Sequence, residues 1–256
     1  MSSEKFTVVQ KALNWSIPRD LLQHLTHGIS GLTSYDGAML HRRLHGFVAE
    51  HLTREAAHTL QQRLIAHGYE AEVVASEHIP RLMAPMHCQR LFIETSGLRA
   101  ATSAGRVYSM AKDEISLLGG GRFQRRAPLP SPVRSLDPFT SVPSESDTWR
   151  RPSTQLNDSN EPEFVLELFQ WKEPFRIRFL LQHAIPIFVN EQALSLRRPA
   201  DLASAIARLA HALPTLHISV GLQHIGDPRF TYVSQGALEE ELRWHLLFAF
   251  REHHAR

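Results

Sequence analysis

The chain has 256 residues, of which 43% are hydrophobic and 21% are charged, so it can bury a sizeable core and is not disordered throughout. Its 28 basic and 26 acidic residues leave a net charge of +2. This balance does not favour nucleic acid as a partner, because proteins that bind it usually concentrate positive charge on one face. The single cysteine, Cys88, excludes a disulfide within the chain.

The sequence carries no recognisable targeting or membrane-spanning segment. The N-terminal residues MSSEKFTVVQ lack the basic segment and apolar run of a signal peptide. The apolar run Leu246–Phe250 near the C-terminus is far shorter than the roughly 20 residues that a transmembrane helix needs. We therefore expect a cytoplasmic protein with no transmembrane segment.

The first 80 residues predict a β-α-α-β-α-β unit. We expect strands at 5–12, 46–52 and 69–75, and helices at 17–27, 34–43 and 54–66. The helix at 54–66 has the strongest signals. The Thr53 hydroxyl can accept a hydrogen bond from a free backbone N–H at its start, apolar residues follow at helical spacing, and Gly68 can end it in a left-handed conformation.

Three runs in this unit resemble the C-terminal domain of the bacterial ribosomal stalk protein. They are GLTSYDGA at 31–38, GFVAEHLTREA at 46–56 and LIAHGYEAEV at 64–73. The family shares a Gly-Leu turn into a short helix, a valine-bearing strand and a Thr/Ser-(Lys/Arg)-Glu-Ala helix start. Over residues 5–76, the resemblance implies a small sheet backed by helices, the fold also found in the adaptor of the Clp protease. Such a scaffold often contacts other proteins.

The resemblance also points to one surface of this unit. In the ribosomal family, the helix after the Gly-Leu turn presents lysines and glycines to translation GTPases. The matching helix here presents a different set of side chains, namely Tyr35, Asp36, Met39, Arg42 and Arg43. We expect these five residues to bind a protein partner, whose identity the sequence does not give.

The clearest break in the chain is at residues 124–162. This segment holds seven prolines and seven serines and shows no apolar periodicity. It cannot bury enough apolar surface to offset the entropy of ordering, so we expect it to be disordered. The sequence leaves open whether it links two domains or interrupts the second one.

Residues 81–256 predict a mainly antiparallel β domain closed by helices. We expect strands at 87–95, 98–102, 107–110, 164–171 and 175–181, and helices at 198–213 and 236–254. In the strand at 175–181, phenylalanine and isoleucine alternate with Arg176 and Arg178, which predicts a sheet with one buried face. The whole chain is thus expected to be α+β, with an N-terminal domain at 1–80 and a second domain at 81–256.

The run RVYSMAKDEI at 106–115 is similar to an element of bacterial pleckstrin-homology-like domains, in which a turn and a strand precede an acidic residue and an isoleucine. This resemblance covers about 88–213 if residues 124–162 are an insertion. It implies a domain that binds proteins or lipid headgroups.

Several residues invite a chemical role but fit a structural one better. His41 and His45 have helical i, i+4 spacing, yet zinc needs three or four ligands, and neither His-Glu-x-x-His nor paired cysteines accompany them. Cys88 and His87 are adjacent on a strand and point to opposite faces, which predicts a buried structural thiol. The glycines at 119–121 lack the spacing of a phosphate-binding loop and predict a flexible strand exit.

The acidic run at 239–241 lies in the first turn of the last helix, where we expect a solvated face. We thus predict no catalytic, metal or cofactor residues, and a non-catalytic protein-interaction or regulatory protein of unknown pathway and oligomeric state. A metal- or nucleotide-dependent enzyme and a peripheral membrane-binding module remain alternatives, the latter through the second domain or residues 246–250.

Overall fold

A computed structural model gives the fold of the chain. It describes residues 4–13, 16–33, 35–37, 45–94, 97–123, 163–170, 175–181, 187–189, 192–194, 199–213 and 217–254. Helices and strands are combined with antiparallel and mixed sheets, so the predicted α+β class is confirmed.

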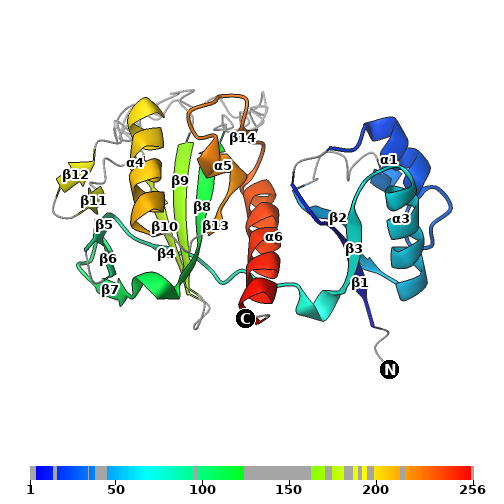
Figure 1. Cartoon of the computed structure of the whole chain (residues 1–256), viewed down its shortest axis with the longest axis horizontal. Coiled ribbons are helices and arrows are strands. Elements are labelled where there is room, and N and C mark those ends of the chain that lie inside the picture. The colour runs from blue at the N-terminus through cyan, green and yellow to red at the C-terminus, as the bar shows by residue number, and fades with distance from the viewer. Residues whose placement is uncertain are drawn as a thin grey trace, which may run out of the picture.

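The N-terminal unit, residues 4–80, is built on a three-stranded antiparallel sheet in the order β2-β1-β3. Its strands are β1 (Phe6–Gln10), β2 (Phe47–Leu52) and β3 (Ala71–Ala75), followed by the short helix η2 (Ser76–His78). Helices α1 (Arg19–Thr26) and α3 (Arg54–Ala66) cover one face of the sheet (Figure 1). Leu22, Leu25, Leu60 and Leu64 from these helices pack on Val8 of β1.

Helix α3 begins and ends where the sequence predicts. The Thr53 hydroxyl accepts a hydrogen bond from the Ala56 N–H at 3.3 Å. At the other end, Gly68 has a φ of 82° and the Tyr69 N–H bonds back to the Leu64 carbonyl at 3.0 Å. Local residues thus form hydrogen bonds with backbone groups at both ends of the helix, which explains why the sequence alone locates this helix.

The second unit, residues 81–254, contains two sheets. The larger has the order β13-β8-β9-β10-β4, with β14 also pairing with β8, and the smaller has the order β12-β11-β5-β6-β7. The strands are β4 (Met86–His87), β5 (Arg90–Ile93), β6 (Leu98–Ala101), β7 (Val107–Met110), β8 (Ile115–Phe123), β9 (Glu163–Gln170), β10 (Phe175–Leu180), β11 (Ile187–Val189), β12 (Gln192–Leu194), β13 (His217–Ile218) and β14 (Thr231–Tyr232). The helices are η3 (Lys112–Glu114), α4 (Pro199–Ala212), α5 (Val220–Gln223) and α6 (Gln235–His254).

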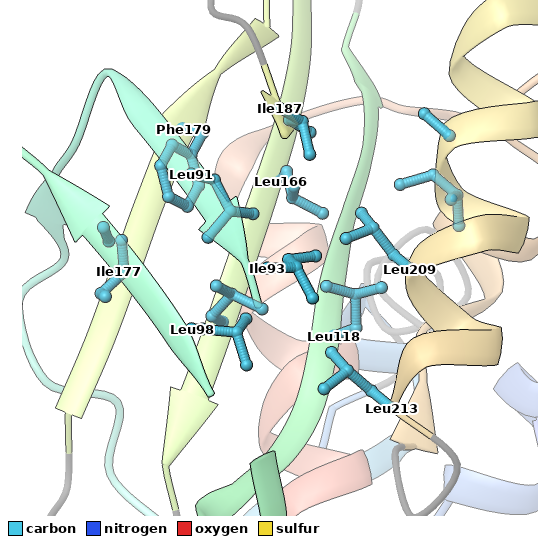
Figure 2. Packing of buried hydrophobic residues seen from close by; sticks show 14 of the residues in the cluster. Leu91, Ile93, Leu98, Leu118, Leu166, Ile177, Phe179, Ile187, Leu209 and Leu213 are labelled. Atoms are coloured by element: carbon cyan, nitrogen blue, oxygen red, sulfur yellow. The ribbon is translucent and has the colours of Figure 1, made fainter. Parts of the chain in front are cut away.

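The main core of the second unit lies between the two sheets and α4. Figure 2 shows Leu209 and Leu213 beside Leu118 of β8, with Ile93 and Leu98 of the β5–β6 hairpin packed nearby. The predicted hairpin is confirmed by antiparallel pairing of Ile93 with Leu98.

Residues 124–162 connect two neighbouring strands of one sheet. β8 and β9 pair antiparallel along their length, with Phe123 opposite Glu163. The segment therefore interrupts the second unit and does not link it to the N-terminal unit. Its predicted disorder concerns residues outside those described.

Helix α6 lies between the N-terminal sheet and the larger sheet of the second unit (Figure 1). Leu238, Leu242 and Leu246 pack against the second unit. Trp244 and Leu247 pack against the N-terminal sheet. The larger sheet is consequently covered on both faces, and the prediction of one buried face is wrong: Arg176 and Arg178 are 4% and 6% exposed.

The prediction of a flexible exit at residues 119–121 is also wrong. These three glycines lie in β8 and are buried. A Cβ on Gly119 would collide with Leu242 of α6, and one on Gly121 would collide with the ring of Tyr232. Gly120 has a φ of 142°, and a Cβ there would meet the Val165 carbonyl of the neighbouring strand. The missing side chains allow α6 and Tyr232 to approach the sheet closely.

Candidate functional site

A cavity of about 250 Å³ with a mixed polar and apolar lining lies at the junction of the two units, beside α6. Residues from distant parts of the chain line it: Gln10, Leu13, His45, Val220, Gly221, Arg229, Phe230, Thr231, Tyr232 and Glu241. We call it the junction cavity. Ligand sites often lie between domains and combine apolar walls with a few polar groups, so this cavity is the strongest candidate site among the described residues.

The carboxylate of Glu241 is the central polar group of the junction cavity. Its side chain comes from α6, and the residue is only 4% exposed. Oε1 accepts a hydrogen bond from the Val220 N–H at 2.7 Å, and Oε2 accepts one from the Tyr232 hydroxyl at 2.7 Å. Burial acts to raise the pKa of Glu241, but His245, Tyr232 and the Val220 N–H together hold it below its usual range. Glu241 is therefore ionised at neutral pH.

Tyr232 is held as a neutral hydrogen-bond donor. Its hydroxyl donates to Glu241 and accepts a hydrogen bond from the Gly221 N–H at 3.1 Å. Burial, with a further contribution from the charge of Glu241, raises the pKa of Tyr232 far above its usual range. The phenol therefore orients the carboxylate and is not a base.

Ser219 fixes the backbone that faces Glu241. Its hydroxyl accepts a hydrogen bond from the Gly120 N–H and donates one to the Gly120 carbonyl, both at 3.1 Å. This clamp attaches the start of α5 to β8. The N–H groups of Val220 and Gly221 are thereby presented to Glu241 and Tyr232, and a Cβ on Gly221 would collide with the Tyr232 ring.

His45 forms part of the opposite wall. Its ring centroid lies 5.8 Å from that of Tyr232, and the two rings are inclined by 54°. Burial lowers the pKa of His45, and the charge of Glu241 offsets only part of this effect. The imidazole is therefore neutral at pH 7.

This environment makes the stability of the protein depend on pH. Below the ordinary histidine pKa of 6.5, the unfolded chain takes up a proton at residue 45 more readily than the folded chain does. The free energy of unfolding should therefore decrease as the pH falls from 7 to 5, and His45→Phe should make that decrease smaller. Urea unfolding at several pH values tests this. An equal change in the exposed-site control His78→Phe would contradict the assignment to His45.

His245 lies behind Glu241, one helical turn further along α6. It is 9% exposed, and its buried Nε2 has no hydrogen-bond partner among the described residues. Nε2 is 3.6 Å from Glu241 Oε1, which is too long for a strong hydrogen bond. The prediction of a solvated acidic face is thus wrong for Glu241, and also for Glu239, which pairs with buried Arg176 at 2.9 Å.

The mouth of the junction cavity carries an ion pair. Arg229 contacts both carboxylate oxygens of Asp227, through Nε at 3.0 Å and through Nη2 at 2.6 Å. The guanidinium lowers the pKa of Asp227 to about 2, so both partners stay charged. The positive charge of Arg229 is already balanced by its neighbour.

The residues predicted to bind a partner lie elsewhere. Tyr35 has an exposed fraction of 71%. The Asp36 carboxylate accepts hydrogen bonds from the Thr33 N–H at 2.6 Å and from its hydroxyl at 2.7 Å. Tyr35 and Asp36 do not line the junction cavity. Met39, Arg42 and Arg43 lie outside the described residues.

Cys88 and the histidines considered above as reactive or metal-binding residues do not form a reactive site in the described part of the chain. Cys88 is 3% exposed, and burial raises the pKa of its thiol to about 11, so the predicted buried thiol is confirmed. Within the described ranges, no three His, Cys, Asp or Glu side chains are placed to hold a metal ion. His41 lies outside those ranges.

The apolar run at 246–250 is part of α6, where Leu246, Leu247 and Ala249 are buried. They pack inside the protein and do not form an exposed membrane-binding face. In the described part of the chain, no helix combines the length and apolar character needed to cross a bilayer.

Neither protein-family models nor curated proteins nor solved structures match the chain. The resemblances of residues 5–76 to the ribosomal stalk domain and of 88–213 to pleckstrin-homology-like domains therefore remain predictions.

Proposed function

We propose that the chain is a non-catalytic protein-interaction or regulatory protein, and that its N-terminal unit presents Tyr35 to a protein partner. The observation that carries this proposal is the 71% exposure of a tyrosine whose neighbours Asp36 and Gly37 are held by hydrogen bonds and by close packing. Tyrosine is enriched among the residues that dominate binding energy in protein interfaces.

The backbone around Tyr35 is anchored by its neighbours. On one side, Thr33 and Asp36 hydrogen-bond to each other through side chains and backbone N–H groups. On the other, Gly37 packs so closely against α1 that a Cβ would lie 2.9 Å from the Gln23 Cα. An exposed aromatic ring on such a fixed turn loses little conformational entropy when it is buried by a partner.

The remaining features agree with this role. The most buried carboxylates of the second unit, Glu167 and Glu241, both have hydrogen-bonding partners within the fold. The lone buried thiol of Cys88 suits a reducing compartment, and we place the protein in the cytoplasm.

Photo-crosslinking from position 35 tests this proposal. A photoreactive phenylalanine analogue at position 35, expressed in the native cell, should capture one specific protein. The same analogue at position 107, where Val107 is also exposed at 54%, should not capture it. With the purified partner, Tyr35→Ala should weaken binding at least about tenfold, whereas Val107→Ala should leave it unchanged.

Equal capture from both positions would contradict the proposal, as would an affinity that Tyr35→Ala does not alter. Circular dichroism of each variant shows whether the fold is retained. The exposed position of Tyr35 predicts that it is.

A further inference from the structure

Among the residues that the structure describes, the carboxylates of Glu167 and Glu241 are buried, and their charges are balanced in different ways. Glu167, fully buried, accepts hydrogen bonds from the guanidinium groups of Arg176 and Arg178 at 2.7 and 2.6 Å. Glu241, which is 4% exposed, accepts hydrogen bonds from two neutral donors, the Val220 N–H and the Tyr232 phenol. Its ion-pair partner is His245, whose Nε2 lies 3.6 Å from Oε1, beyond direct hydrogen-bond distance. A buried carboxylate without a directly bound cation is energetically costly.

Glu241 also borders the junction cavity, and its hydrogen-bonding capacity is not exhausted. An ionised carboxylate offers about four lone-pair positions. The described structure fills one on each oxygen, with Val220 and Tyr232. The remaining positions can accept hydrogen bonds from a donor in the cavity.

We propose that the junction cavity binds a small organic cation, a protonated amine, whose N–H groups donate to the carboxylate of Glu241. This binding activity goes beyond the proposed protein-interaction role and does not depend on Tyr35.

The walls of the junction cavity suit such a ligand. Tyr232 and His45 place two inclined aromatic rings beside the carboxylate, and aromatic faces attract cations. Leu13 and Val220 add apolar surface for the carbon part of the amine. At about 250 Å³, the cavity lies just below the usual range for drug-sized ligands, which favours a small molecule.

The charged groups nearby leave Glu241 without a directly hydrogen-bonded cation, because His245 pairs with it only at the longer distance of 3.6 Å. Arg229 at the mouth is engaged by both carboxylate oxygens of Asp227. His45 makes a ring contact with Tyr232 and no hydrogen bond that the described residues reveal. Asp227 thus balances Arg229, and among the described lining residues Glu241 is the charged group without a directly hydrogen-bonded counter-charge, which favours an ammonium group over a carboxylate or phosphate.

Because the cavity lies between the two units, ligand binding should affect how tightly they associate. Leu13 and His45 belong to the N-terminal unit, whereas Val220 and Tyr232 belong to the second unit. A bound amine would contact both and would strengthen their association through mass action.

Three probes of similar shape and size but different charge test whether the cavity selects a cation. Benzylammonium, benzyl alcohol and benzoate are titrated into the full chain at pH 7 and followed by isothermal calorimetry. We expect benzylammonium to bind at least about tenfold more tightly than either of the others, because only it can pair with a buried carboxylate. Similar binding of all three, or binding of none, would overturn the proposal.

Two variants then locate the site. Glu241→Gln, which keeps the shape but removes the charge, should weaken benzylammonium binding at least about 30-fold. The control Glu77→Gln alters a carboxylate that is 74% exposed and should bind as the unchanged protein does. Leu13→Trp puts a larger side chain on the cavity wall that the N-terminal unit forms. It should exclude the ligand without altering the hydrogen bonds of Glu241.

If Glu241→Gln fails to fold, Leu13→Trp decides the question alone. Retained binding in a folded Leu13→Trp or Glu241→Gln protein would overturn the assignment to this cavity. Tyr35→Ala should bind benzylammonium normally, so failure of the partner surface and failure of the amine site give different results.

Discussion

Replacing Glu167 with glutamine should lower the free energy of unfolding by about 3–5 kcal/mol, because the change leaves two buried guanidinium groups without their shared counter-charge. Glu167 comes from β9, and Arg176 and Arg178 come from the adjacent strand β10. Their side chains are 0%, 3% and 8% exposed, so water cannot replace the lost charge.

A second carboxylate, Glu239 of α6, takes part in the same cluster. Its Oε1 accepts hydrogen bonds from Arg176 at 2.9 Å and from Gln235 at 2.9 Å. The side chain is 33% exposed, and it lies 3.5 Å from Arg178. Glu239 can compensate for only part of the missing charge in Glu167→Gln.

Urea unfolding of Glu167→Gln and of a matched control, Glu163→Gln, measures the effect. Glu163 is on the same strand but only half-buried, and its replacement should change the unfolding free energy by less than about 0.5 kcal/mol. If both variants lose the same small amount of unfolding free energy, the charge of Glu167 does not stabilise the buried cluster as predicted.

A triple variant distinguishes the cost of an unpaired charge from the value of the cluster itself. Replacing Glu167, Arg176 and Arg178 together with apolar residues of similar volume should be far less harmful than Glu167→Gln, because the buried charges are removed together and the remaining carboxylate of Glu239 is 33% exposed. A triple variant that is much less stable than Glu167→Gln would show instead that the ion pairs themselves stabilise the fold.

The sequence predicts elements well where their signals are local. Helix α3 has its Thr53 cap and its Gly68 terminator within the same segment. The β5–β6 hairpin and the β9–β10 pair are likewise joined by short connections. In each case, neighbouring residues provide the hydrogen bonds that fix the element's ends or register.

The burial of Arg176 and Arg178 was not predicted, because strand alternation alone does not say what covers the second face. A signal was nevertheless present in the sequence. Glu167 interrupts an otherwise apolar strand, and in the observed β9–β10 pair it stands opposite Arg178. A carboxylate and an arginine facing each other between apolar neighbours indicate a covered ion pair as readily as a solvated face.

The junction cavity depends on contacts between residues far apart in the chain. His45, Tyr232 and Glu241 meet only because α6 packs between the two sheets. The pattern of α6 contains part of this information, since it is apolar on two sides, at Leu238 and Leu242 and again at Trp244 and Leu247. A helix that is apolar on two sides packs between two bodies, so a polar residue of that helix, such as Glu241, can be buried.

Replacing Trp244 with alanine should weaken the contact between the two units and should cost about 3–5 kcal/mol of stability. Trp244 is 9% exposed, and its indole N–H donates a hydrogen bond of 2.7 Å to the Gln10 carbonyl of β1. Its side chain lies against Gly46, where no Cβ would fit. Alanine removes the ring and leaves a void between α6 and the N-terminal sheet.

Besides the apolar packing of Leu247, the remaining contacts across this junction include two ion pairs. Arg243 binds Glu50 at 2.9 Å, with both side chains partly exposed, and Arg251 contacts Glu72. Partly exposed pairs of this kind contribute little to stability. The N-terminal unit of Trp244→Ala should therefore unfold before the second unit.

Differential scanning calorimetry would detect this as two transitions, or as a van't Hoff enthalpy below the calorimetric one, in place of one cooperative transition. Trp244→Phe is the matched control. It keeps an aromatic ring against Gly46 but loses the indole hydrogen bond, so it should cost only about 1 kcal/mol and keep a single transition. A single transition in Trp244→Ala would mean that the units are held together by something other than this ring. Because the junction cavity has walls from both units, loosening their contact should also weaken benzylammonium binding, even though Trp244 does not line the cavity.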